Sequence, residues 1–555
     1  MPGPFSLSLR SSIVAGLVRT AVIAGCVIAG WSIRAGARPG SDRRDGSLKN
    51  TEVTRAVTVP KEVILAPVAA EPPLRLGGRS QLLVDTERLA SWWNVRHVQA
   101  KLRKHQQNPL VEADEEWEET ARKSWGIQLC TAIRDESDGL FKMWYQIERH
   151  TGGDVPAYAF SKDGVAWTKP HLGLVEFAGT KQNNVLCRVD PDGRRRIGGG
   201  KYLIRDNRPR PASHRFLAIG PPPFHADGSQ WGAFWGIAYS ADGLVWHQMP
   251  GGLRGGAGGG NPSCFWDPRL QRYVLYNRHL SEHADPQADC PRYTCRQESR
   301  DLVRWSPRQT AFHPMDERWP EVESMQVYVH EGISFGLPSM LENDVRGDAE
   351  VHLLTSRDGR RWQHPFPREA FIPKGPKGAW DDNIIWWPSL VTHGDRMLFY
   401  YGGARYRHNV NGLPPGIRQI RIGMGWVPRD RLIGLETRKQ LGGRGAFLTR
   451  PFVVEGDELI VNADVRGELR VEIVQPVTEF SDSGGKGHIK HYVGAGAPLY
   501  DGYRRRDCRV IRGDKLDHRV RWQTRPIGKL RNKTVRLRFV FRDATIWAFR
   551  VAAPG

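Results

Sequence analysis

The sequence predicts an all-β protein made of a five-bladed β-propeller followed by a C-terminal β-sandwich. Two observations lead to this fold class. Short segments rich in aromatic and β-branched residues, bounded by Gly, Pro, Asn and Asp, recur along the chain as strands do. A Ser-x-Asp turn followed by Trp closes a series of such segments at intervals of roughly 55 to 80 residues, the scale of propeller blades. The expected parts are a signal peptide (1–37), a linker (38–78), the propeller (79–440) and the sandwich (441–555).

The repeated turn is the most regular feature of the chain. Its four copies are Ser161–Trp167, Ser240–Trp246, Ser299–Trp305 and Ser356–Trp362, and a degenerate fifth copy begins at Pro428. Asp followed by Gly, as in three copies, is typical of hairpins because Gly tolerates the positive φ of a tight turn. The Ser and Asp oxygens can accept hydrogen bonds from nearby backbone N–H groups. We interpret the turn as a structural connection between outer blade strands and not as a binding site.

Each turn ends a series of expected strands. These strands are 127–133, 139–145, 157–160 and 165–167 in the first blade, 184–189, 201–204, 235–239 and 244–246 in the second, 263–266, 272–276 and 293–298 in the third, 325–329, 333–336 and 351–355 in the fourth, and 389–392, 396–401 and 420–424 in the fifth. An earlier strand is expected at Ser80–Val84. We expect it to pair with the last blade, because closing the ring removes exposed sheet edges.

The pattern changes at about Gly442, where longer segments alternate apolar and polar residues. Such alternation is typical of half-buried antiparallel strands and predicts the β-sandwich. The expected strands are 445–449, 458–462, 468–473, 518–522, 534–541 and 545–549. We expect the sandwich to pack against the propeller or to provide accessory sugar binding.

The N-terminus predicts export to the periplasm or the medium. Arg10 and Arg19 precede the uncharged apolar run Ala21–Ile33, and small residues follow, as in a secretory signal peptide with its cleavage site. The run is too short for a membrane span. The alternative is that Ile23–Cys26 is a bacterial lipobox that anchors the protein through Cys26. The apolar run continues beyond this cysteine, which favours plain export.

The formal net charge is +21 at pH 7. Basic charge raises the affinity for polyanions such as nucleic acid, acidic lipids and sulfated or uronic polysaccharides. The basic residues are spread over the whole chain and no nucleic-acid-binding module is recognisable, so no nucleic-acid partner is expected. The expected partner is a polysaccharide or oligosaccharide, and an acidic one suits an exported basic protein. The alternative is a basic surface without a specific partner.

The sequence predicts no cofactor and no metal. His279 and His283 match the H-x-x-E-H pattern of one class of zinc proteases. That chemistry needs a helix so that both rings share a face, and here the pattern lies between strands. Cys290 and Cys295 follow closely and could pair in an oxidising compartment. The other cysteines after the signal peptide fall on apolar segments, so we expect buried thiols.

In a propeller, ligands bind where the loops that enter the inner strands converge. The residues just before the expected inner strands include amides, carboxylates and Trp rings. This combination suits a sugar, because Trp stacks on its apolar face and the polar groups bind its hydroxyls. The predicted substrate-binding residues are Trp117, Trp125, Asn183, Asn261, Trp380, Asp382 and Arg405.

Carboxylates in the same loops are candidates for catalysis. Glycoside hydrolysis needs two carboxyl groups, one an acid with a raised pKa and the other a base or nucleophile. The predicted catalytic residues are Glu118, Glu323 and Asp381. The alternative for each is structural, since acidic residues in propeller loops also cap turns or pair with Arg.

Five further motifs in the sequence support a resemblance to known proteins. They are His105–Leu110, Trp117-Glu118, Gly139–Tyr145, Trp266–Pro268 and Phe399–Gly403. They resemble secreted bacterial proteins classed as glycoside hydrolase family 32-like. That class belongs with the five-bladed propeller glycosidases, among them levanases, invertases and arabinofuranosidases. The resemblance covers about residues 79 to 555 and implies the propeller fold more strongly than an activity.

The chain departs from family 32 at the catalytic motifs. Family 32 enzymes carry a Trp-Met-Asn-Asp-Pro-Asn-Gly nucleophile motif, an Arg-Asp-Pro motif in the second blade and a Glu-Cys acid motif. Neither Asn-Asp-Pro nor Glu-Cys occurs here, and Trp266–Pro268, the nearest match to Arg-Asp-Pro, falls in the expected third blade. The resemblance therefore leaves the substrate open and speaks against fructan hydrolysis.

Three functions follow as hypotheses. The first is an exported glycosidase-like propeller that acts on polysaccharide or oligosaccharide by carboxylate acid/base chemistry. The second is a non-catalytic carbohydrate-binding propeller. The third is a sialidase-like hydrolase, because the repeated turns resemble Asp-boxes, although a sialidase needs an inward triad of Arg residues and usually six blades.

Overall fold

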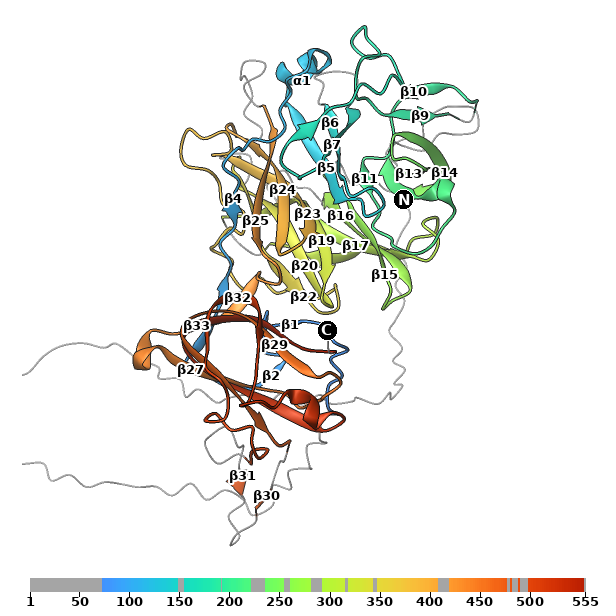
Figure 1. The fold of residues 1–555 in the computed structure, drawn as a ribbon. Coiled ribbons are helices and arrows are strands. Elements are labelled where there is room, and N and C mark those ends of the chain that lie inside the picture. Colours follow the sequence, from blue (N-terminus) through green and yellow to red (C-terminus); the bar gives the residue numbers. More distant parts are fainter. Residues whose placement is uncertain are drawn as a thin grey trace, which may run out of the picture. The chain divides into compact units, whose positions relative to one another are not determined.

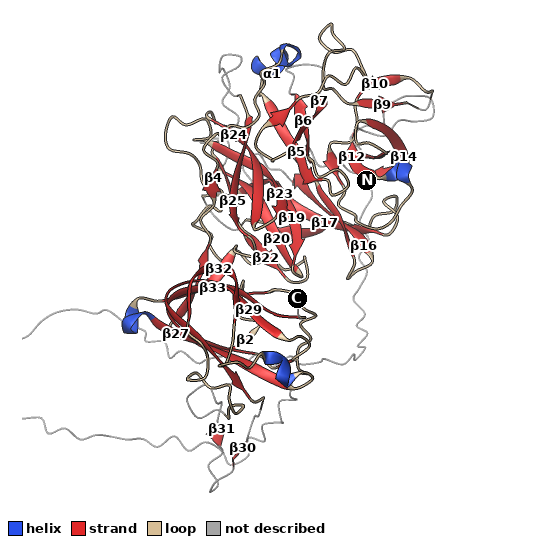
Figure 2. Ribbon diagram, viewed as in Figure 1, coloured by secondary structure: helices blue, strands red, loops and turns tan. Residues whose placement is uncertain are grey.

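The computed structural model describes residues 72–147, 154–190, 192–220, 235–253, 260–280, 292–314, 318–342, 347–407, 419–476, 480–481, 488–489 and 498–553. The predicted signal peptide, His283 and Cys290 lie outside these ranges. The described part is nearly all β, as predicted (Figure 2). Its short helices are α1 (Glu119–Arg122), η1 (Glu116–Glu118), η2 (Ala212–His214), η3 (Gln440–Gly443) and η4 (Ile527–Leu530). Within these ranges, no helix has the length and apolar character that crossing a membrane requires.

Four sheets follow one another along the chain (Figure 1). Sheet 1 contains β5 (Ile127–Arg134), β6 (Phe141–Ile147), β7 (Val155–Ser161) and β8 (Trp167–Thr168). Sheet 2 contains β9 (Cys187–Val189), β10 (Arg195–Ile197), β11 (Tyr202–Leu203), β12 (Phe216–Gly220), β13 (Trp235–Ser240) and β14 (Val245–Leu253). Sheet 3 contains β15 (Ser263–Asp267), β16 (Arg272–Leu280), β17 (Arg292–Ser299) and β18 (Gln309–Phe312). Sheet 4 contains β4 (Arg103–Lys104), β19 (Glu321–His330), β20 (Ile333–Leu341), β21 (Ala349–Val351), β22 (Leu354–Ser356), β23 (Ile384–His393), β24 (Arg396–Ala404) and β25 (Arg421–Pro428).

Sheet 4 has two halves. Half 4a contains β19 to β22, and half 4b contains β23, β24, β25 and β4. A parallel pairing of Ala349 in β21 with Ile384 in β23 joins the two halves. The halves correspond to the segments expected as the fourth and fifth blades.

The expected strand order in the second sheet was wrong. The segment 184–189 was expected as the first, inner strand, but β9 pairs in parallel with β14, the strand after the repeated turn. The opposite edge of the sheet is β11, at residues 202–203. The cause is a long-range parallel pairing, which leaves no trace in the local alternation of side chains.

A hydrophobic core lies between each sheet and the next. These cores contain Trp144 and Trp246 between sheets 1 and 2, Ile219 and Leu275 between sheets 2 and 3, Tyr276 and Val322 between sheet 3 and half 4a, Phe335 and Tyr401 between halves 4a and 4b, and Phe141 and Tyr400 between half 4b and sheet 1. The sheets therefore pack in the order 1, 2, 3, 4a and 4b, and half 4b packs against sheet 1 again.

The repeated turns have the predicted structural role. Ser161 Oγ donates a hydrogen bond to Asp163 Oδ1 and accepts one from the N–H of Gly164, both at 2.9 Å. The other three copies contain the same bonds. An aromatic side chain of a preceding sheet donates to the turn in three copies, from Tyr400 to Gly164 O, Trp144 to Gly243 O and Tyr276 to Gly359 O. The turns thus fasten neighbouring sheets together.

The remaining strands form a nine-stranded C-terminal sheet and a short hairpin. The C-terminal sheet contains β1 (Gln81–Leu82), β2 (Leu89–Trp93), β3 (Val95–Gln99), β26 (Ile433–Thr437), β27 (Arg444–Thr449), β28 (Phe452–Val453), β29 (Glu458–Val474), β32 (Ile511–Arg519) and β33 (Thr534–Ala552). The hairpin pairs β30 (Phe480–Ser481) with β31 (His488–Ile489). The pairings within the C-terminal sheet are antiparallel, as predicted. The expected strands 458–462 and 468–473 are parts of one strand, β29. β-Bulges in the residues between these two expected segments allow β29 to stay paired with β33 along its whole length.

The expected pairing of Ser80–Val84 with the last blade was also wrong. Gln81 of β1 pairs with Phe549 of β33, and it is β4 that pairs with β25. Leu83 explains the difference, because its buried side chain belongs to the core of the C-terminal sheet. β1 to β3 therefore pair into the C-terminal sheet although they precede the propeller strands in sequence.

Candidate functional site

Side-chain and backbone hydrogen bonds link one strand from each of sheets 1, 2 and 3 and from halves 4a and 4b, namely β5, β11, β15, β19 and β23. The links are Thr131 (β5) to Lys201 and Leu203 (β11), Arg205 after β11 to Cys264 (β15), Ser263 (β15) to Val327 (β19), Tyr328 (β19) to Pro388 (β23), and Ser389 (β23) to Ala132 (β5). The series starts and ends at β5. We call these five strands the inner strands.

Three inner strands carry an irregularity in their pairing. The register shifts between Leu129 and Thr131 in β5, between Val322 and Ser324 in β19, and between Trp386 and Ser389 in β23. Such bulges redirect a side chain and are common beside active sites. The residues in the shifts of β19 and β23 include Glu323 and Trp387.

The bulges of β19 and β23 lie next to each other. The N–H of Trp387 donates to Ser339 Oγ at 3.1 Å, and Ser339 pairs with Ser324, which follows Glu323. Trp387 has a φ of 50°, a backbone conformation that bulky residues rarely adopt. Its indole stacks on that of Trp386 with ring centroids 4.3 Å apart. Strain of this kind is concentrated at functional sites.

Glu323 is held between two arginines. Its side chain is buried, Arg278 pairs with Oε1, and Arg292 Nε lies 3.7 Å from Oε2. Arg292 also donates to Oε2 of Glu321 at 2.7 Å, so one guanidinium contacts two carboxylates of β19. Among the described residues, Glu323 Oε2 and the neighbouring Ser324 Oγ have no hydrogen-bond partner. A buried oxygen without a partner costs stability and has capacity to bind a ligand.

Glu118 has a different environment, in which both carboxylate oxygens accept hydrogen bonds. Tyr145 OH donates to Oε1 at 2.8 Å, and Lys169 Nζ donates to Oε2 at 2.6 Å. Burial and the charge of Glu118 raise the pKa of Tyr145 well above its ordinary value. Trp117 joins the same network by donating to Asn184 Oδ1 at 2.9 Å, and Asn184 in turn donates to Tyr145 OH.

Asp381 is buried in a third network. Its Oδ2 accepts from Lys104 Nζ at 2.5 Å and from Tyr401 OH at 3.0 Å. Burial lowers the pKa of Lys104, although the hydrogen bond and the charge of Asp381 oppose this. Burial, together with Asp381, raises the pKa of Tyr401. Trp380 stacks on the Tyr401 ring with centroids 5.8 Å apart.

The other predicted binding residues are dispersed. Trp125 packs against the cluster that contains Trp386 and Trp387. Asn183 donates to the carbonyls of Val175 and Thr180 and so holds the loop before β9.

Asn261 ties inner strands together. Its Nδ2 donates to Leu129 O of β5, and its carbonyl accepts from Gln326 of β19, both at 2.7 Å. Asp382 accepts from the N–H of Gly378 at 2.6 Å and caps that turn. Arg405 is exposed.

The structure therefore distributes the three predicted catalytic carboxylates over three networks. Within the described ranges, no hydrogen bond or ion pair connects Glu118, Glu323 and Asp381. Sequence reasoning missed Arg278, which pairs with Glu323 although the two residues are 45 positions apart. It also missed Trp387, whose position depends on the bulge in β23. The adjacent Trp386, Trp387 and Pro388 were the only local sign of this irregularity.

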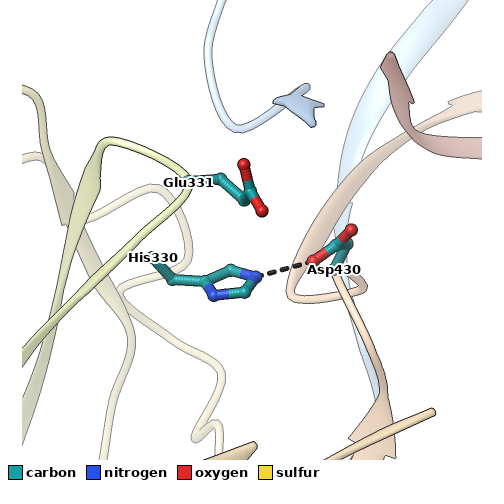
Figure 3. A group of neighbouring side chains, drawn as sticks. All are labelled: His330, Glu331 and Asp430. Carbon is teal, nitrogen blue, oxygen red and sulfur yellow. Dashed lines mark hydrogen bonds and ion pairs between the residues drawn. The ribbon is translucent and has the colours of Figure 1, made fainter. Parts of the chain in front are cut away.

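One further cluster has metal-ligand chemistry. His330, Glu331 and Asp430 place one ligand atom each within 4.8 Å of one another (Figure 3). His330 Nε2 lies 2.6 Å from Asp430 Oδ1, and Ser80 donates to Asp430 and to Glu331. Burial raises the pKa of Asp430, but its hydrogen bonds with His330 and Ser80 outweigh burial and lower it. These bonds join the β19–β20 turn to the degenerate fifth turn and account for the cluster as a structural contact.

No protein-family model matches the sequence, and no curated protein matches it. Similar solved structures include a chain titled "Glycoside hydrolase", with 14% identity and a TM-score of 0.38 over 60% of this chain and 92% of that chain. A thermostable family-43 glycoside hydrolase has 13% identity and a TM-score of 0.36 over 55% of this chain and 92% of that chain. A beta-1,2-mannobiose phosphorylase from Listeria innocua has 8% identity and a TM-score of 0.38 over 59% of this chain and 97% of that chain. Because these TM-scores lie below 0.5, the fold and the site rest on the protein's own strand pairings and contacts.

Proposed function

We propose that this chain is a five-bladed β-propeller with a C-terminal β-sandwich, and that it acts on an oligosaccharide or polysaccharide. The blades are sheets 1, 2 and 3 and the halves 4a and 4b. The cyclic order of the five cores supports five blades, as does the series of hydrogen bonds that returns from β23 to β5. The extensive hydrophobic core of the C-terminal sheet, which contains Phe447, Val471 and Phe539, supports the sandwich. Membership of glycoside hydrolase family 32 stays a prediction.

The bulges of β19 and β23 support a sugar site at the inner strands. They bring together a carboxylate with an oxygen that accepts no hydrogen bond, two arginines and the unusual backbone conformation of Trp387. Sugars are bound by such polar groups through their hydroxyls. The observation that carries the proposal is that Oε2 of Glu323 is buried and accepts no hydrogen bond from the described residues, with only the ion-pair contact of Arg292 at 3.7 Å.

In this site Glu323 is the acid/base carboxylate. One carboxyl group of the site protonates the leaving glycosidic oxygen, and the other activates water or attacks the anomeric carbon. Glu321 is the second carboxylate that the geometry favours, because Arg292 contacts both residues. Glu118 and Asp381 hold the blades and take no part in proton transfer.

A non-catalytic carbohydrate-binding propeller is the second candidate. The observation that favours it is the pairing of each predicted catalytic carboxylate with a cation, namely Lys169, Arg278 or Lys104. In a binding protein the same carboxylates only accept hydrogen bonds from sugar hydroxyls. Export and an acidic character of the saccharide are part of both proposals.

The test compares hydrolysis and binding in the full chain. Purified protein is offered a panel of neutral and acidic polysaccharides, and released reducing sugar and heat of binding are measured. Glu323→Gln is compared with Glu298→Gln, a matched change of another glutamate paired with arginines. Loss of sugar release in Glu323→Gln alone supports the glycosidase. Binding without release supports the binding protein, and neither binding nor release of any saccharide contradicts both.

A further inference from the structure

The C-terminal sheet carries a groove of about 480 Å³ whose lining is strongly basic. Its charged residues are Arg444, Glu468, Arg470, Arg505, Arg506 and Arg542. Five arginines thus face a single carboxylate. None of these residues belongs to the inner strands or to the contacts of Glu323.

Strand register explains how the arginines meet. Arg542 of β33 pairs with Arg444 of β27 on one side and with Glu468 of β29 on the other. Arg470, two positions further along β29, pairs with Val540 and so lies on the same face. Like charges directly opposite each other destabilise a sheet. The cross-strand pairing of Arg444 with Arg542 therefore lowers the stability of the sheet.

Four of the five groove arginines have no carboxylate partner among the described residues, and Arg506 only approaches Asp507 at 4.0 Å. The next cross-strand pair shows the contrast, because Arg538 forms an ion pair with Glu472 at 2.9 Å. Within the described ranges, no ion pair involves Arg444, Arg470, Arg505 or Arg542. Nε of Arg542 is buried and has no hydrogen-bond partner there. Arg470 donates to the carbonyls of Arg505 and Cys508, so the fold uses this guanidinium for hydrogen bonds, but no carboxylate of the described residues neutralises its charge or that of Arg444, Arg505 and Arg542.

The residues that line the groove indicate which kind of anionic ligand it can bind. A guanidinium matches carboxylate and sulfate groups with two parallel hydrogen bonds. Phe541, the aromatic residue of the lining, is 1% exposed, so the groove offers no ring on which a nucleic-acid base could stack. The partly buried Val540 provides a small apolar surface between the charges, which suits the face of a sugar ring.

We propose that this groove binds an anionic saccharide through its uronate or sulfate groups. The choice of a saccharide rests on the proposed function, whereas the choice of an anion rests on the groove alone. The groove is then an accessory site that holds an acidic polysaccharide on the C-terminal sheet while the inner strands act on it.

The test uses the full chain and two double variants of equal charge. Arg444→Gln/Arg542→Gln removes two charges from the groove. Arg519→Gln/Arg521→Gln removes two charges that are paired with Glu458 elsewhere in the same segment. The affinities for polygalacturonate, a chondroitin sulfate, neutral dextran and single-stranded DNA are measured by calorimetry at two salt concentrations.

The proposal expects the groove variant to lose at least about tenfold in affinity for the polyuronate or the sulfated polysaccharide. The control variant changes less than about twofold, and dextran does not bind. Equal losses in both variants would mean that net charge alone causes the binding and would overturn the site. Tighter binding of DNA than of either polysaccharide would also overturn it. Glu323→Gln keeps this binding, so failure of the inner-strand site and failure of the groove are separate results.

Discussion

Glu118, Glu323 and Asp381 are 0%, 5% and 2% exposed, so all three carboxylates are removed from water. Burying a carboxylate is costly unless hydrogen bonds and opposite charges compensate it. Both oxygens of Glu118 have such partners, whereas Oε2 of Glu323 has no hydrogen bond among the described residues. At the scale of single residues, the oxygen without a hydrogen bond is the difference between Glu323 and Glu118.

The structural role of Glu118 predicts a stability effect. Glu118→Gln removes the charge that pairs with buried Lys169, so the free energy of unfolding falls by about 3 kcal/mol. The measurement is the denaturant midpoint of the purified variant. Glu119→Gln changes the exposed neighbour on α1 and leaves the midpoint unchanged. Equal midpoints for Glu118→Gln and the wild type would show that the buried network does not stabilise the fold.

At the scale of single elements, Gly243 shows why the repeated turn that begins at Ser240 tolerates little change. Gly243 has a φ of 80°, and a Cβ there would lie 2.7 Å from Cζ2 of Trp144. The indole cannot move aside, because Trp144 is fully buried and donates to Gly243 O. The turn therefore requires glycine for its backbone conformation and for the packing of the neighbouring sheet.

Comparing Gly193 with Gly243 separates the requirement for backbone conformation from the requirement for packing. Gly193 has nearly the same φ, 79°, but a Cβ there meets nothing within 4 Å. Gly193→Ala is expected to cost about 1 kcal/mol from backbone strain alone. Gly243→Ala is expected to cost at least about 2 kcal/mol more, because the added methyl overpacks the core between sheets 1 and 2. Thermal unfolding of both variants is the measurement, and similar midpoints would contradict the packing argument.

The molecule as a whole depends on contacts between successive sheets, and Asp135 provides a charged one. It accepts from Lys142 of sheet 1 at 2.6 Å and from Arg215, which precedes β12 of sheet 2, at 2.5 Å. Burial raises the pKa of Asp135, but its hydrogen bonds from Lys142 and Ser137 outweigh burial, so the pKa falls from 3.8 to about 2.

This shift predicts how stability changes with pH. Because the folded pKa lies below the unfolded one, the stabilisation is complete above about pH 4 and is lost as the pH falls toward about 2. It amounts to about 2 kcal/mol. The thermal midpoints of the wild type and Asp135→Asn should therefore converge between pH 5 and pH 2. A difference that stays constant over this range would contradict the account.

Local patterns predicted much of the strand content. The turns at Ser161, Ser240, Ser299 and Ser356 form as expected, because their bonds lie within a few residues. Pairing over long distances escaped prediction. β9 pairs in parallel with β14, and β1 pairs with β33, and neither contact changes the local alternation of side chains.

The site was predicted less completely than the fold. Glu323 could be selected because it precedes an expected inner strand, but Glu118 and Asp381 match the same description and have structural partners. The catalytic roles of all three stay predictions, because their partners lie far along the chain, as with Glu118 and Lys169, which are 51 positions apart. Bulges depend on the register with a neighbouring strand, so the position of Trp387 was not predictable from its own segment.

The central claim is that a saccharide binds at the bulges of β19 and β23. The most direct test is a crystal structure of Glu323→Gln with an oligosaccharide that the wild-type protein recognises. The account predicts sugar density within hydrogen-bond distance of residue 323. Density confined to the basic groove of the C-terminal sheet, with none at the inner strands, would contradict it.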